Sequence, residues 1–333
     1  MKGSVAGTLT LPVPEMLSAV YLVPTELDKD SARSLIDSAL SPRLPDPLGT
    51  VVADMLSRGA AQVAVMPARP EPPVPRDLQD RIGVPPELVE AVTSATKFAV
   101  VTAMWLPSWP PLHELVARAC ASALAAEVAA PVVDTSIPQV LSAERAVLTL
   151  QPPPDLLTLS EWVLVFVSAG PQGLWLATKG LSRFGLPELR VDGVPPDLGE
   201  PWSVLMQGIA AKVFALWFQA LRVKDSRAAD SADSGDSGAA DSGTADSGAA
   251  GPGDPEAAVI EIPDMIVVSE ADVARAHDMS PKGDRSCQAL FRLAFDPVPD
   301  PGADRFLTVA PPDDFPGTVG EYFEQACAAI FGP

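Results

Sequence analysis

Apolar positions along the chain repeat with two different periods. Short runs rich in β-branched and aromatic residues predict strands over 18–23, 62–66, 98–105, 162–167, 174–178, 188–191, 289–295 and 305–310. Elsewhere, apolar residues recur every three or four positions, which predicts helices over 30–40, 49–58, 111–129 and 201–221. A last helix is expected after Thr318, which forms a capping-box pattern with Glu321.

The order of these elements predicts the fold class. The strand at 98–105, the helix at 111–129 and the segment 131–134 have the order of a βαβ crossover. We therefore expect an α/β or α+β fold in which a mixed sheet is covered by helices.

A change in composition divides the chain into three parts. Residues 225–257 contain seven Asp, one Glu and one Arg among Ala, Ser, Gly, Thr and Pro, with no large apolar residue. Such a stretch cannot offset its ordering entropy, which predicts a disordered acidic tether. The expected organisation is a mixed α/β domain over 1–224, the linker over 225–257, and a C-terminal segment over 258–333 that completes the main domain. The alternative is that this segment forms a small domain of its own.

The helix at 201–221 is apolar enough to suggest a membrane span. Lys212 at its centre would cost about 2.5–3.5 kcal/mol on an insertion scale, so a buried core helix is the preferred interpretation.

The charge balance restricts the expected partners. There are 43 acidic and 23 basic side chains, which give a formal charge of −20. Polyphosphates and anionic lipid surfaces would be repelled, so neither nucleic acid nor a membrane is an expected partner, whereas a basic protein is.

Cysteine usage and the N-terminus predict a cytoplasmic protein. Cys120, Cys287 and Cys327 are odd in number and widely spaced, which argues against disulfides and structural zinc. Residues 1–20 lack an unbroken apolar run, so no signal peptide is expected.

The sequence contains only weak candidates for catalytic residues. No common nucleotide-binding, hydrolase or metalloprotease motif occurs, so no cofactor or metal is predicted. His113 is expected on a partly exposed helix flank, and Cys120 and Cys327 on buried stripes where a thiol pKa is raised. Asp134, Glu188 and Cys287 remain possible participants in an unrecognised pocket.

One segment has a distinctive motif. Residues 180–189 read G-L-S-R-F-G-L-P-E-L, between the strand at 174–178 and the helix at 201–221. Over residues 160–222 this arrangement resembles a bacterial family of uncharacterised proteins, a domain of unknown function, with the signature G-x-x-x-F-G-x-P-E-L. The resemblance constrains the fold and implies no activity.

The residues of the motif predict a structural turn. Gly180 and Gly185 permit positive φ or close backbone approach, and Phe184 supplies an apolar plug. Pro187 makes the preceding residue extended and starts a strand at Glu188. On this interpretation Glu188→Gln changes stability little. The alternative is a recognition surface formed by Lys179, Arg183 and Glu188.

The preferred functional expectation is a non-enzymatic, cytoplasmic protein-interaction module, for example of the immunity or accessory type. The acidic composition and the missing catalytic signatures motivate it. The alternative is an enzyme that uses carboxylates or backbone donors, and a pocket on which Asp134, Glu188 or Cys287 converge would favour that alternative.

Overall fold

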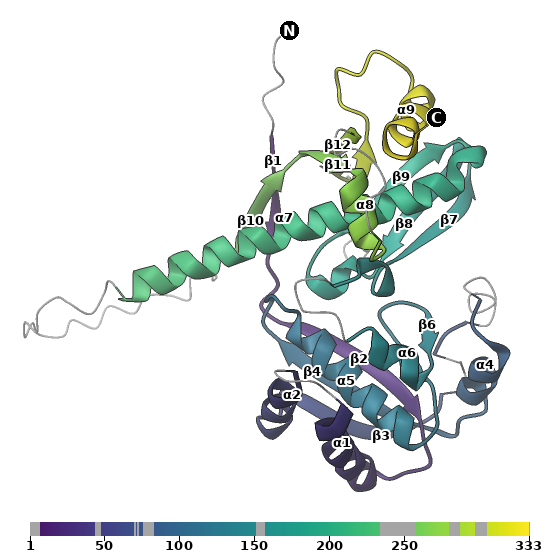
Figure 1. Ribbon diagram of the computed structural model, residues 1–333, viewed down its shortest axis with the longest axis vertical. Coiled ribbons are helices and arrows are strands. Elements are labelled where there is room, and N and C mark those ends of the chain that lie inside the picture. The colour runs from purple at the N-terminus through teal and green to yellow at the C-terminus, as the bar shows by residue number, and fades with distance from the viewer. Residues whose placement is uncertain are drawn as a thin grey trace, which may run out of the picture.

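The computed structural model has a mixed α+β fold with two large sheets (Figure 1). It describes residues 7–43, 48–69, 71, 73–75, 83–150, 157–233, 258–279, 287–296 and 305–332. Most of the tether predicted at 225–257 lies outside the described residues.

The first sheet is built entirely from antiparallel pairs, in the order β3-β4-β2-β5-β6. Its strands are β2 (Leu17–Pro24), β3 (Ala61–Pro67), β4 (Lys97–Trp105), β5 (Val132–Asp134) and β6 (Gln139–Leu141). The expected crossover is present, because α5 (Leu112–Glu127) joins two parallel strands, β4 and β5. Strand β2 lies between them and is antiparallel to both.

Helices cover both faces of this sheet. On one face, α5 packs on β2 and β4, and α1 (Lys29–Arg43) and α2 (Leu48–Ser57) pack beside α5. Helix α5 is buried on all sides from His113 to Ala125, because alanines and Ser122 let its neighbours approach closely. On the opposite face, a smaller apolar cluster includes Val92 of α4 (Pro86–Thr93) and Phe98.

The second sheet is mixed, in the order β11-β12-β13-β9-β8-β7. It contains β7 (Leu164–Gly170), β8 (Gly173–Lys179), β9 (Glu188–Val194), β11 (Met265–Ser269), β12 (Gln288–Phe295) and β13 (Phe306–Ala310). Its one parallel pair joins β13 to β9, so strands from 258–333 share a sheet with strands that precede α7 (Gly199–Asp233).

Helix α7 is the central element of the second half. Trp202, Met206, Ile209 and Trp217 of α7 are fully buried against β7, β8, β9, α8 (Glu270–Ala276) and α9 (Val319–Phe331). The helical segment Pro196–Lys224, which joins a short 3-10 turn to α7, is long and apolar enough to cross a membrane. Most of its apolar stretch is buried in the protein, as in a core helix. The helix continues to Asp233, so its last turns fall within the stretch predicted to be tether.

A separate two-stranded ribbon lies against α7. Strand β1 (Thr8–Pro12) pairs antiparallel with β10 (Val259–Pro263), and Leu11, Ile260 and Ile262 face the core. Figure 1 shows α7 extending past this ribbon, away from the two sheets.

Candidate functional site

The motif singled out in the sequence forms the turn between β8 and β9. A short 3-10 helix over Leu181–Phe184 is flanked by Gly180 at φ 123° and Gly185 at φ 81°, so both glycines have the predicted positive φ. A Cβ atom on Gly180 would lie 2.3 Å from the backbone oxygen of Trp162. Only glycine fits there, and after Pro187 the chain enters β9 at Glu188, as predicted.

The Glu188 carboxylate is folded back beneath this turn. It accepts hydrogen bonds from the backbone amides of Gly180 (2.8 Å), Ser182 (3.1 Å) and Leu181 (3.2 Å), and from Thr178 Oγ1 (2.8 Å). The side chain is buried, so these four donors satisfy a carboxylate that a partner at the surface cannot reach.

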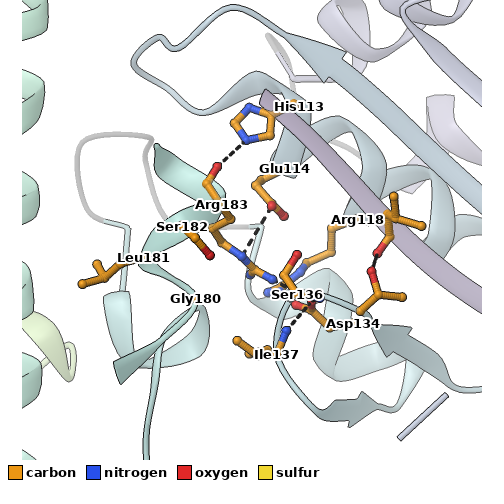
Figure 2. A network of polar contacts seen from close by, with 12 residues as sticks. His113, Glu114, Arg118, Asp134, Ser136, Ile137, Gly180, Leu181, Ser182 and Arg183 are labelled. Atoms are coloured by element: carbon orange, nitrogen blue, oxygen red, sulfur yellow. Dashed lines mark hydrogen bonds and ion pairs between the residues drawn. The ribbon is translucent and has the colours of Figure 1, made fainter. Parts of the chain in front are cut away.

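Arg183 points from the same turn into the first half of the protein (Figure 2). Its Nη2 donates to Asp134 Oδ1 at 2.6 Å, and its Nε lies 3.4 Å from Glu114 Oε1. The backbone oxygen of Arg183 accepts a hydrogen bond from His113 Nε2 at 2.9 Å. The turn therefore ties the second sheet to α5 and to the end of β5.

A second arginine completes this buried network. Arg118 donates to Asp134 Oδ2 (2.9 Å), to the Tyr21 hydroxyl (3.2 Å) and to Thr149 Oγ1 (3.0 Å), and its guanidinium lies 3.4 Å from the ring centre of Trp162. The Tyr21 hydroxyl in turn donates to Glu114 at 2.7 Å. Two guanidinium groups thus face two carboxylates in a site closed to solvent.

Burial and charge shift the ionisation of these groups in opposite directions. Burial alone raises the pKa of Asp134, but Arg183 and Arg118 hold that pKa below its usual value. Burial raises the pKa of Tyr21 well above its usual value. The side chains of Arg118, Asp134 and Arg183 are wholly inaccessible, so the network is suited to joining the two halves and not to turning over a substrate.

Several members of this network could not be predicted from the motif. Tyr21, Glu114, Arg118, Thr149 and Trp162 come from four different elements or loops. The sequence feature that could have indicated this network is the spacing of Glu114 and Arg118, four residues apart on a helix rich in alanine. The expectation that His113 is partly exposed was wrong, because α5 is covered on every side and His113 is fully buried.

The other sequence candidates are dispersed. Asp134 and Glu188 both support the motif turn, but each carboxylate is held by its own donors. Cys120 and Cys327 are buried, as predicted, and burial raises their thiol pKa values to about 12 and about 11. Cys287 is half-buried and immediately precedes β12. In the described part of the chain, no three His, Cys, Asp or Glu side chains are grouped to hold a metal ion.

Protonation of His113 should make stability depend on pH. Burial lowers its pKa, and because a carbonyl can only accept, Nε2 carries the proton while Nδ1 has no partner. The unfolded chain therefore binds a proton that the folded chain excludes, and the free energy of unfolding should fall as the pH drops from about 7 to about 5.

Urea unfolding across this pH range measures the effect. The free energy of unfolding should depend less steeply on pH in His113→Gln. His277 contributes to the pH dependence that remains, because burial lowers its pKa too. An unchanged slope in His113→Gln would contradict this assignment.

An accessible groove lies between α7 and β10. This α7–β10 groove has a volume of about 620 Å³ and is lined by Leu216, Gln219, Ala220, Val223 and Lys224 of α7 and by all five residues of β10. Its walls are mainly apolar, with one cation at Lys224 and one anion at Glu261.

One edge of β10 carries backbone groups that β1 does not use. The amide of Asp264 donates to Gly7, and the amide of Val13 donates to the carbonyl of Ala258. Antiparallel pairing alternates, so the even-numbered residues of β10 bond to β1, whereas the backbones of Val259 and Glu261 face the other way. No described strand pairs with that edge.

Comparison of the chain with family models, curated proteins and solved structures found no match. The resemblance of the motif to a bacterial family therefore stays a prediction.

Proposed function

We propose that this chain is a non-catalytic, cytoplasmic protein-interaction module that binds an extended, basic segment of a partner protein as a third strand beside β10. The observation that carries the proposal is an edge of β10 that pairs with no strand of the described residues and borders an apolar groove. Strand addition of this kind takes its affinity from main-chain hydrogen bonds and its specificity from pockets for alternate side chains.

The groove offers both main-chain hydrogen bonds and pockets for side chains. The backbones of Val259 and Glu261 offer donors and acceptors at strand spacing. Leu216, Ala220 and Val223 of α7 provide an apolar floor for every second side chain of an added strand. An exposed strand edge is normally protected from pairing, whereas Val259 and Glu261 on this edge are exposed and no described strand covers them.

Charge favours a basic partner. The chain carries a formal charge of −20, which attracts cationic segments at long range and repels acidic ones. Within the groove, Glu261 provides a local anion for a basic side chain of the added strand.

The alternative of an enzyme has less support. It required Asp134, Glu188 or Cys287 to converge on a pocket, but the two carboxylates are buried in separate sets of hydrogen bonds. None of the three lines the α7–β10 groove.

Glu261→Pro tests the proposal directly. Proline removes an amide that points away from β1, so the ribbon should keep its ladder while the added strand loses a donor and meets a ring. Peptides selected on the wild-type protein from a random phage-displayed library should be basic. They should bind Glu261→Pro at least about tenfold more weakly.

The matched control is Thr10→Pro. Thr10 is the partner of Glu261 across the ribbon, and its amide faces the opposite edge. This variant should bind the selected peptides as the wild type does. Selection of no peptides, or equal binding to both proline variants, would refute the proposal. If Glu261→Pro instead lowers the molecular mass in solution, the edge pairs with a second copy of the chain.

A further inference from the structure

A second cavity lies across α7 from the groove. It has a volume of about 550 Å³, within the range of small-molecule sites, and it is lined by Trp109, Leu159, Phe214, Phe218, Arg222 and Arg275 among others. Gln219 and Val223 border both this cavity and the α7–β10 groove, so they form the ridge that separates the two.

One wall of this cavity is aromatic and fixed. Trp109 packs edge-on against Phe214 and Phe218, with ring centres 5.6 and 5.0 Å apart. Phe184 of the motif supports the wall from behind, with its ring centre 4.8 Å from that of Phe214. Phe184 is fully buried, so the motif turn preorganises an apolar surface for a ligand.

The charged groups at this cavity are both cations. Arg222 of α7 and Arg275 of α8 are exposed side chains, and no Asp or Glu is among the described lining residues. Arg275 also contacts Asp272 Oδ1 at 3.3 Å, but the other oxygen of that carboxylate is taken by the capping box of α8. The two guanidinium groups make the charge around this cavity positive, although the chain as a whole is strongly acidic.

We propose that this cavity binds a small organic monocarboxylate with an apolar body. The body packs against Trp109, Phe214 and Phe218, and the carboxylate is held by Arg222 and Arg275. A guanidinium matches a carboxylate with two parallel hydrogen bonds, which a neutral or cationic head group cannot form. Such binding does not depend on the peptide groove, because it uses a different side of α7.

The test compares three probes that differ in their head group: phenylbutyrate, phenylbutanol and phenylbutylamine. Isothermal titration calorimetry should show phenylbutyrate binding at least tenfold more tightly than phenylbutanol, with the amine weaker still. Arg222→Gln/Arg275→Gln should weaken phenylbutyrate at least tenfold and leave phenylbutanol nearly unchanged. Ala215→Phe, which places a ring at an exposed lining position, should abolish binding of all three.

Matched controls separate this site from general charge and from the groove. Arg58 also pairs with an aspartate on a helix surface, so Arg58→Gln should bind phenylbutyrate as the wild type does. Glu261→Pro should do the same, whatever its effect on peptides. The proposal would be overturned if phenylbutyrate did not bind, if the alcohol bound equally well, or if the double variant or Ala215→Phe bound like the wild type. Thermal melting checks that each variant is folded.

Discussion

Replacing Arg183 with methionine should lower the free energy of unfolding by about 3–5 kcal/mol, because it leaves the buried Glu114 without its ion-pair partner and Asp134 with Arg118 alone. The guanidinium is inaccessible to solvent and contacts Asp134 at 2.6 Å and Glu114 at 3.4 Å. Arg118 would then face both acids alone. Methionine keeps an unbranched chain in the site, so the loss reports mainly on charge and hydrogen bonding.

Equilibrium urea unfolding of purified variants measures this loss. Arg190→Met is the control, because Arg190 lies in β9, is 40% exposed and pairs with Asp192 at the surface. Exposed pairs contribute about 0–1 kcal/mol, so the control should unfold near the wild-type midpoint. Equal midpoints for the two variants would mean that the buried network contributes no more than a surface pair.

Local patterns were sufficient to predict most of the secondary structure. The alternating run at 289–295 forms β12, and Thr318 and Glu321 form a complete capping box at the start of α9. Strands β1 and β10 were not predicted, although both alternate in burial. They are short, contain or adjoin proline, and pair across a large separation in sequence (Thr10 with Glu261), for which no local signal exists.

The backbone of the motif was easier to predict than its side chains. Positive φ at Gly180 and Gly185 and the strand start after Pro187 follow from local sterics. The burial of Arg183 and Glu188 does not, because charged side chains are normally exposed unless a partner is at hand. The ion-pair partners of Arg183 lie in α5 and β5, and only the tertiary fold brings them to the turn.

The motif serves three structures at once. Glu188 fixes the turn, Arg183 joins the turn to α5 and β5, and Phe184 supports the aromatic wall beside α7. A substitution in the turn should therefore lower the stability of the fold and also change the shape of the cavity. The sequence interpretation, in which a turn and a recognition surface were alternatives, did not foresee a turn whose Phe184 packs against a residue that lines a cavity.

Glu188→Gln should cost about 2–4 kcal/mol of unfolding free energy, in contrast to the small change expected from the sequence. Both carboxylate oxygens act only as acceptors: Oε1 receives the amides of Gly180 and Ser182, and Oε2 receives the amide of Leu181 and the hydroxyl of Thr178. A glutamine must place an NH₂ group against one of these sets. Whichever way the amide turns, at least one buried backbone N–H then faces another donor.

The control is Glu324→Gln, which removes the same charge from an exposed position on α9 and should change the unfolding free energy by less than about 0.5 kcal/mol. Chemical unfolding of both variants at pH 7 gives the comparison. If Glu188→Gln is as stable as the control, the backbone amides of the turn tolerate a hydrogen-bond donor at position 188. The Glu188 carboxylate would then not be what fixes the backbone of the turn. A loss within the expected range would instead show that the Gly180–Phe184 turn is held from below, by one side chain that reaches back from β9.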